Sequence, residues 1–201
     1  MAAMTVTDAG PRSPRAERTR MVIADALLSL LEEGDLQPTA ARIADRAGIS
    51  LRLIYHHFAD LEELFEVLAR REGYRMMQRV EPVPADLSFA DRLDQFVDQR
   101  ARVLEWLTPV ARAAALHEPF SVALRAAHDA SDALAEREID RVFAAELDPL
   151  PSAEREAQVD ALTAATAWPT WNGLRMSGRT FDRSLAAMHR LVASVLVATT
   201  R

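Results

Sequence analysis

The amino-acid sequence predicts an all-α fold, and three observations carry that prediction. Apolar residues recur at intervals of three and four along most of the chain, Ala is abundant, and runs of β-branched residues are scarce. The 201 residues suffice for one large domain or two small ones. We therefore expect nine helices and no sheet.

Four helices are expected in the N-terminal part of the chain, at residues 15–33, 40–47, 51–57 and 61–79. Gly34 ends the first, because glycine accepts the left-handed conformation that closes a helix. Thr39 and Ser50 are placed to cap the second and third. Asp60 and Glu63 predict a capping box at the start of the fourth.

Five further helices are expected after the proline-rich segment EPVPAD at residues 81–86. Their predicted ranges are 88–107, 109–116, 121–147, 153–176 and 181–199. Pro109 is expected to open a helix of its own, and Pro169 to kink the helix that contains it.

These elements divide the chain into an arm at residues 1–14, a three-helix domain at 15–60 and a helical bundle at 61–201. The arm contains Gly10, Pro11 and Pro14, and we expect it to be disordered. The first 20 residues lack the apolar core of a signal peptide, and the longest apolar run is too short to span a membrane. We expect a cytoplasmic protein without a membrane partner.

The net charge of −6 argues against general affinity for nucleic acid, but the distribution of charge matters more. Residues 12–58 hold seven Arg and six acidic residues, whereas residues 59–201 hold 17 Arg and 23 acidic residues. The acidity therefore lies mostly outside the three-helix domain. The chain has no Cys, which excludes a disulfide framework and thiolate chemistry.

Residues 41–65, ARIADRAGISLRLIYHHFADLEELF, have the pattern of a helix-turn-helix. Two short helices flank a glycine turn, and Ile54 and Phe58 are spaced to anchor the second helix to the core. Arg52 and His56, also four residues apart, share another face of that helix. In such motifs the N-terminal residues of the second helix reach base edges in the major groove.

The order I-A-x-x-A-G-I-S, then L-x-x-I-Y-H-H-F, then D-x-E-E-L-F resembles the DNA-binding domain of the tetracycline-repressor (TetR) family, over residues 18–66. The residues that carry the resemblance are Thr39, Ile43, Ala44, Ala47, Gly48, Ser50, Ile54, Tyr55, His57 and Phe58. The resemblance implies a DNA-binding domain at 15–60 and a ligand-binding and dimerisation domain at 61–201. It also implies a homodimeric regulator, usually a repressor, that a small molecule releases from an inverted-repeat operator.

Two places depart from the family pattern. Arg52 and Leu53 stand where the family usually has Gly followed by a small residue. Leu61 stands where the family usually has a Lys that contacts phosphate. One expected phosphate contact is therefore in question, and Arg52 is a candidate for a new one.

The candidate DNA contacts lie on the two helices of the motif or at their caps. They are Thr39, Arg42, Arg46, Ser50, Leu51, Arg52, Leu53, Tyr55, His56 and His57. The family places Tyr55 and His57 mostly on phosphates, and His56 is expected to face the groove. Four arginines nearer the N-terminus are either further DNA contacts or solvated side chains; they are Arg12, Arg15, Arg18 and Arg20.

Some of these residues have a second interpretation. Arg52 suits a guanine edge, but a phosphate contact or a solvated side chain is the alternative. Tyr55 could instead pack its ring against the first helix. Leu51 is spaced with Ile54 and Phe58 as a core residue, whereas the family alignment places it near the groove, which we favour.

The adjacent histidines are not expected to bind a metal. Neighbouring residues of a helix point about 100° apart, so His56 and His57 do not converge on one ion. The sequence shows no Gly-rich phosphate loop and no set of ligands with metal spacing. We expect no cofactor, no metal and no enzymatic activity.

Nine residues of the C-terminal domain are candidates for an effector site, namely Met76, Arg100, Trp106, His117, Phe120, Trp168, Trp171, Asn172 and Arg175. Large rings with a few polar groups suit a mostly apolar pocket, although core packing explains each residue taken alone. Arg100 lies within the apolar stripe of its helix, and a buried Arg needs a partner. That partner is either an anionic group of a ligand, or Glu72 or Glu118 in an internal ion pair.

The last predicted helix has apolar residues around much of its circumference, so other helices must pack against it on two sides. We therefore expect a two-fold dimer through the eighth and ninth predicted helices, residues 153–176 and 181–199. The competing function is a helical small-molecule-binding protein or enzyme with a vestigial helix-turn-helix. Leu61 favours that alternative, whereas Arg52, Tyr55 and His57 favour a DNA-binding regulator.

Overall fold

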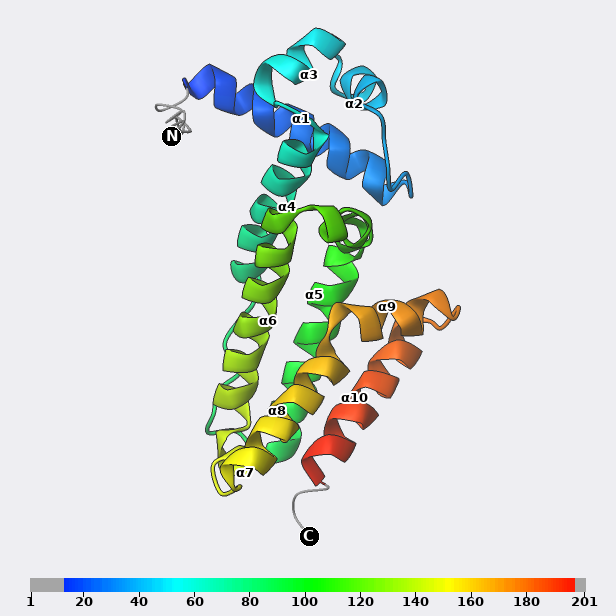
Figure 1. The fold of residues 1–201 in the computed structure, drawn as a ribbon. Coiled ribbons are helices and arrows are strands. Elements are labelled where there is room, and N and C mark those ends of the chain that lie inside the picture. Colours follow the sequence, from blue (N-terminus) through cyan, green and yellow to red (C-terminus); the bar gives the residue numbers. More distant parts are fainter. Residues whose placement is uncertain (1–12, 198–201) are drawn as a thin grey trace, which may run out of the picture. The chain divides into compact units, whose positions relative to one another are not determined.

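The computed structural model describes residues 13–197, which are mostly helical and contain no strand in that range. The helices of the N-terminal part are α1 (Pro14–Glu32), α2 (Ala40–Ala47), α3 (Leu51–His57) and α4 (Leu61–Met77) (Figure 1). The later elements are α5 (Phe89–His117), the 3-10 turn η1 (Glu118–Phe120), α6 (Val122–Val142), α7 (Ala144–Leu147), α8 (Ser152–Thr166), α9 (Trp168–Met176) and α10 (Phe181–Val197). The predicted all-α fold is confirmed. Nearly all of the predicted arm, including Arg12, lies outside the described residues.

The chain forms two units, Met1–Leu68 and Ala69–Arg201, and the boundary between them falls inside α4. The sequence predicts the boundary earlier, at residue 60. Residues 61–68 of α4 belong to unit 1, and Leu64, Phe65, Val67 and Leu68 are buried there. The first two turns of α4 therefore complete the N-terminal core.

Unit 1 is built on α1, against which both α2 and α3 pack. Its core contains Ile23, Leu27, Leu30, Leu31, Ile43, Ala44, Ile54 and Phe58. Val22 is apolar as well, but it is 47% exposed. Ala24 is buried instead, so the buried face of α1 is turned away from Val22.

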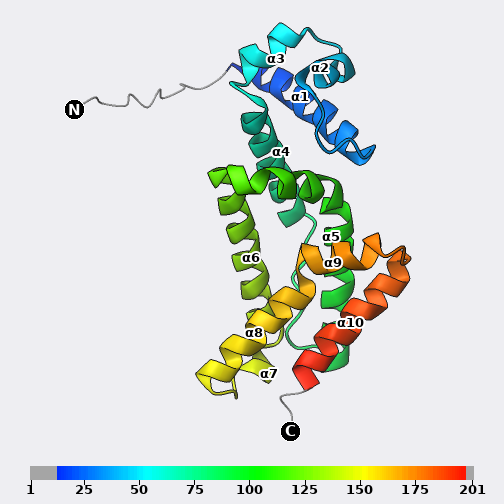
Figure 2. The ribbon, with the colours of Figure 1, turned by 45° about the vertical axis from the view of Figure 1, so that its right-hand side comes forward.

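Unit 2 is a bundle in which α10 packs against α5, α8 and α9, while α6 packs against α5 and α8 (Figure 2). Its core includes the fully buried Trp171 and Phe143. Phe143 meets Phe96 edge to face, with their ring centroids 5.2 Å apart. Edge-to-face pairs add to the stabilisation that burial alone provides.

Pro109 does not begin a new helix, contrary to the sequence-based prediction, because α5 runs through it to His117. A proline inside a helix removes one backbone hydrogen bond, which tertiary packing can offset. Val110 and Ala113, in the turn after Pro109, are buried. Burial of this segment is consistent with packing that holds the helix together despite the proline.

The kink predicted at Pro169 is instead a complete break, with Ala167 extended between α8 and α9. Pro169 lies in the first turn of α9, where its missing N–H leaves no hydrogen bond unmade. The break frees carbonyl groups at the end of α8. The Thr170 hydroxyl donates to the carbonyl of Ala164 over 2.7 Å, and Arg100 Nε donates to the carbonyl of Thr166 over 2.9 Å.

The predicted total of nine helices holds for residues 13–197 when the one-turn α7 is counted with α6. The observed helix boundaries differ from the predicted ones, since two predicted helices merge in α5 and one is split into α8 and α9.

Candidate functional site

The turn between α2 and α3 is fixed by local backbone chemistry. The Thr39 hydroxyl accepts from the N–H of Arg42, and the Ser50 hydroxyl accepts from the N–H of Leu53, each over 3.3 Å. Gly48 ends α2 with φ +67°, a left-handed conformation that side chains disfavour. These caps confirm the predicted limits of both helices and set the direction of α3.

Arg20 joins α1 to the end of α3 and the start of α4. Its side chain is buried, and it donates to the carbonyl of His57 and, over 2.9 Å, to Glu63 Oε1. The guanidinium also lies 4.0 Å from the ring centroid of Phe58. Arg20 is therefore a structural residue and not the DNA contact that its position near the N-terminus suggests.

Glu63 completes this junction through its second carboxylate oxygen. Its Oε2 accepts from the N–H of Ala59 over 2.8 Å, and the N–H of Glu63 donates to Asp60 Oδ1 over 2.8 Å. This is the predicted capping box, with the glutamate reaching one residue further back than usual.

The outward face of α3 carries four exposed side chains. Leu51 and Tyr55 are 44% and 54% exposed, and Arg52 and His56 are exposed as well. Leu51 therefore does not belong to the core, despite its spacing with Ile54. Leu53 and His57 are half-buried at the edges of this face. We call Leu51, Arg52, Tyr55 and His56 the outer face of α3.

The arginines of α2 are also exposed, but both have acidic partners within unit 1. Arg46 binds Glu33 through two hydrogen bonds of 2.8 and 2.6 Å. The hydrogen bond from Arg46 lowers the pKa of Glu33, so this pair stays charged. Arg42 lies 3.2 Å from Asp35. Arg52, in contrast, makes no hydrogen bond or ion pair with any residue in the range 13–197.

The imidazole of His57 is not expected to carry a charge that would attract phosphate. Burial, followed by the nearby charges of His56 and Arg20, lowers the pKa of His57. Its imidazole is therefore mostly neutral at pH 7, and it would meet a phosphate as a neutral hydrogen-bond donor.

Unit 2 contains a cavity of about 210 Å³ between α5, α6 and the end of α4. Its lining consists of Met76, Met77, Val80, Phe96, Gln99, Arg100, Val103, Ser131, Leu134, Ala135 and Glu138. The residues from α5 and those from α6 each follow the spacing i, i+3, i+4, i+7, so each helix contributes one face. This spacing on α6 is visible in the sequence, but the residues of α6 that line the cavity are small, aliphatic or acidic and carry no aromatic ring that would single them out.

Of the nine predicted effector residues, Met76 and Arg100 line this cavity. The other seven do not: Trp106, His117, Phe120, Trp168, Trp171, Asn172 and Arg175. Phe120 is 84% exposed, and Trp106 lies under the guanidinium of Arg79, 4.9 Å away.

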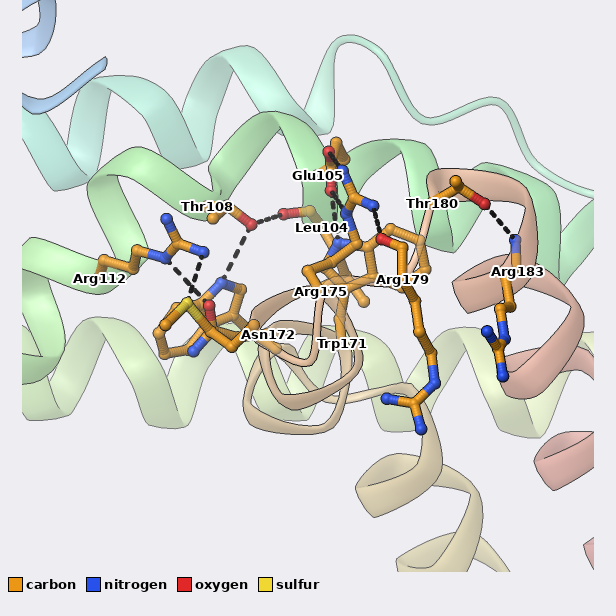
Figure 3. A network of polar contacts seen from close by, with 12 residues as sticks. Leu104, Glu105, Thr108, Arg112, Trp171, Asn172, Arg175, Arg179, Thr180 and Arg183 are labelled. Carbon is orange, nitrogen blue, oxygen red and sulfur yellow. Dashed lines mark hydrogen bonds and ion pairs between the residues drawn. The ribbon is translucent and has the colours of Figure 1, made fainter. Parts of the chain in front are cut away.

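The residues of α9 take part in a polar network with α5 (Figure 3). Glu105 accepts from Trp171 Nε1 over 2.9 Å and from Arg175 Nε and Nη2 over 3.0 and 2.8 Å. Asn172 Oδ1 accepts from Arg112 Nε over 3.0 Å. Their polar groups therefore join two helices of the bundle.

Neither acidic partner predicted for Arg100 binds it. Glu72 pairs with Arg71 and Arg75, and Glu118 lies 3.0 Å from His128 Nδ1. Arg100 instead donates from Nε to the carbonyl of Thr166 at the end of α8.

Residues 13–197 contain no group of three or more His, Cys, Asp or Glu side chains arranged to hold a metal ion. Within the same range, each helix is too short or too polar to cross a membrane.

Comparison with known proteins agrees with this geometry. Residues 23–68 match the family model of bacterial regulatory proteins of the tetR family, and no curated protein matches the chain. A TetR-family transcriptional regulator from Streptomyces coelicolor is similar in structure, with a TM-score of 0.71 and 21% identity over 92% of this chain and 82% of that one. A transcriptional regulator from Rhodococcus sp. Rha1 gives a TM-score of 0.68 and 19% identity over 89% of this chain and 96% of that one.

At such identities the solved structures establish the fold, while the family model identifies the segment that contains the helix-turn-helix and the outer face of α3. Residues 23–68 of this chain therefore match the tetR family of bacterial regulatory proteins, and the chain as a whole has the fold of solved TetR-family transcriptional regulators.

Proposed function

We propose that this protein is a homodimeric repressor that binds an inverted-repeat DNA operator and is released from it by a small molecule. The observation that carries the proposal is the outer face of α3, on which Arg52 has no partner among the described residues. A guanidinium without an internal partner is available for a guanine edge or a phosphate.

The exposed side chains of α3 suit the major groove. Arg52 and His56 offer hydrogen-bond donors, and the exposed Leu51 offers an apolar surface for thymine methyl groups. Thr39, Ser50, Leu53, Tyr55 and His57 remain the proposed contacts around them. Arg42 and Arg46 would reach phosphate only by sharing or exchanging Asp35 and Glu33.

Dimerisation is proposed through α8, α9 and α10, the region of the predicted eighth and ninth helices. Met188, Val192 and Leu196 of α10 face the core of the unit. Leu191 is 42% exposed on another side of the same helix, and Ala164 is exposed on α8. A two-fold dimer would bring two α3 helices about one DNA turn apart, roughly 34–36 Å, as an inverted repeat requires.

The cavity of unit 2 is the proposed effector site, because it is mostly apolar and has an arginine in its wall. We propose no catalytic residues. The proposed location of the protein is the cytoplasm, where its operator DNA would lie. The half-buried Leu61 favours the alternative, a ligand-binding protein with a vestigial helix-turn-helix. The outer face of α3 argues against that alternative.

Selection of duplexes from a random DNA pool tests the proposal. We expect the full chain to enrich an inverted repeat whose affinity falls steeply with salt concentration. Failure to enrich any sequence at low salt would contradict DNA recognition and leave the alternative function.

Arg52→Ala then separates the two roles proposed for Arg52. If Arg52 reads a base, the selected motif relaxes at one position of each half-site. If it binds phosphate, the motif persists and the salt slope falls by about one. Arg137→Ala is the matched control, since Arg137 is exposed on α6, carries the same charge and is not a candidate DNA contact.

A further inference from the structure

We infer that the cavity of unit 2 binds a small, mostly apolar carboxylate, whose anionic group accepts hydrogen bonds from Arg100. This inference rests on the proposed function, in which the cavity is the effector site, and it names the chemical class of the effector.

Arg100 is fixed in place while most of its donors remain unused. Its Nε donates to the carbonyl of Thr166 over 2.9 Å, which sets the position of the guanidinium plane. An arginine has five N–H donors, so four remain on Nη1 and Nη2. Within residues 13–197, these two atoms make no hydrogen bond. A carboxylate matches that pair of donors in geometry as well as in charge.

The other long polar side chains of the wall already have partners. Both ends of the Gln99 amide bind the backbone of Glu81, over 2.7 and 2.9 Å. Both oxygens of Glu138 accept from Arg141, over 3.1 and 2.6 Å. Ser131 is a half-buried hydroxyl that could add one further donor. Arg100 is therefore the cationic group with unused donors at this wall.

The charge of Arg100 is not neutralised by an ion pair with any described carboxylate. Asp132 is close enough for its charge to favour the protonated form, but its carboxylate lies 3.4 Å from His128 Nε2. Burial dominates and lowers the pKa of Arg100, which shows that the surrounding protein does not fully stabilise its charge. An anion in the cavity would supply that stabilisation.

The rest of the cavity wall favours a ligand whose body is apolar. Phe96, Val103, Leu134 and Ala135 line it, and Met76 and Met77 can adjust their shape to different ligands. A cavity of about 150 Å³ holds benzene, so the 210 Å³ here suits an acid somewhat larger than benzene. 3-Phenylpropanoate and octanoate are suitable probes.

Titration calorimetry of the full chain with these two acids, and with the amides that correspond to them, tests the inference. We expect each acid to bind at least about tenfold more tightly than its amide, as a charge-assisted hydrogen bond requires. In Arg100→Gln this preference should disappear, whereas Arg100→Lys should retain part of it. Arg102→Gln is the matched control, because Arg102 is exposed on the same helix and pairs with Asp98.

Equal binding of acid and amide, acid binding unchanged in Arg100→Gln, or no binding of either acid at millimolar concentration would overturn the inference. If Arg100→Gln fails to fold by circular dichroism, Ser131→Phe provides a second test, since a ring at that wall should block the acids from entering. Unchanged binding to Ser131→Phe would then also overturn the inference.

A parallel measurement of DNA affinity separates this inference from the proposed function. Acid binding that depends on Arg100 but leaves DNA affinity unchanged would support the ligand class and remove the effector role. Release of DNA by the amides, with no preference for the acids, would retain the effector role and overturn the ligand class.

Discussion

At the scale of single residues, Arg20 shows how one buried side chain holds three helices together. It reaches the carbonyl of His57 at the end of α3 and the carboxylate of Glu63 at the start of α4, while its guanidinium lies over the ring of Phe58. Arg20 is thus part of the support that positions α3, although it does not belong to its outer face.

Arg20→Met should destabilise unit 1 by about 2–3 kcal/mol, because Glu63 and the carbonyl of His57 lose a charged donor. Urea unfolding followed by circular dichroism measures the loss. All three Trp lie in unit 2, so the transition seen by Trp fluorescence should move less. Arg18→Met is the exposed control and should have little effect on either transition. Equal losses of stability in Arg20→Met and Arg18→Met would contradict the structural role of Arg20.

His128 gives unit 2 a contribution to stability that depends on pH. Burial opposes its charge, but the hydrogen bond and charge of Glu118, with the charges of Asp132 and Asp129, outweigh burial and raise the pKa of His128. A raised pKa in the folded state means that the contribution is complete below the unfolded pKa of about 6.5. It is lost as the pH rises through the folded pKa.

The stability cost of His128→Gln should therefore be larger at pH 5.5 than at pH 8.5. Urea unfolding followed by Trp fluorescence at both pH values measures the difference. Asp132→Asn should reduce the pH dependence, because it removes one of the carboxylates that favour the charged imidazole. A larger cost at the higher pH would contradict this assignment of charges.

At the scale of secondary-structure elements, the two glycines Gly48 and Gly73 should respond in opposite ways to the same substitution. Gly48→Ala should cost about 1–2 kcal/mol, because Gly48 has φ +67° at the end of α2. Gly73→Ala should stabilise α4 by up to about 1 kcal/mol, because Gly73 lies inside a helix. A β-carbon at either position meets no atom within 4 Å, so backbone conformation decides both results.

Thermal unfolding of the two glycine variants, measured by circular dichroism, checks the signs. Gly48→Ala should also weaken DNA binding, since the turn sets the direction of α3. A stabilising Gly48→Ala would show that the turn tolerates a different conformation from the one described.

The elements of unit 1 were predictable because their signals are local. The limits predicted for α2 and α3 coincide with the observed ones, since Thr39, Gly48 and Ser50 act within three residues of their own positions. The divisions in unit 2 were not predictable in this way. Whether Pro109 is tolerated depends on packing, and the break at Ala167 is stabilised by Arg100, which lies on another helix.

The candidate sites differ in the same respect. The outer face of α3 follows from helical spacing and the family resemblance, apart from the ambiguity at Leu51, which its exposure resolves. The cavity depends on which faces of α5 and α6 meet, and the sequence does not show this. The large or polar side chains of α9 suggest a ligand site, but their polar groups pair with α5 or with residues near the end of α9; these residues are Trp168, Trp171, Asn172 and Arg175.

At the scale of the whole molecule, the proposed dimer can be tested with two exposed leucines. Leu191 on α10 is 42% exposed and Leu116 near the end of α5 is 44% exposed, so they are matched in residue type and exposure. Leu191→Glu should raise the dimer dissociation constant by at least about tenfold, because a buried charge at the interface is costly. Leu116→Glu should leave it unchanged.

Analytical ultracentrifugation over a range of concentrations measures the dissociation constant of both variants. Leu191→Glu should also weaken binding to the inverted repeat, because each protomer would then bind a half-site alone. If Leu116→Glu dissociates the dimer and Leu191→Glu leaves it intact, the interface lies at the end of α5 and not on α10.

The position of the unit boundary inside α4 also matters for grafting unit 1 onto another bundle. The helix is continuous through Leu68 and Ala69, so a chimera joined there must preserve helical phase. One inserted residue would turn all that follows by about 100° and advance it by about 1.5 Å. Seven inserted residues would return the phase to within about 20°. The activity of chimeras that carry such insertions should therefore vary periodically with the number of inserted residues.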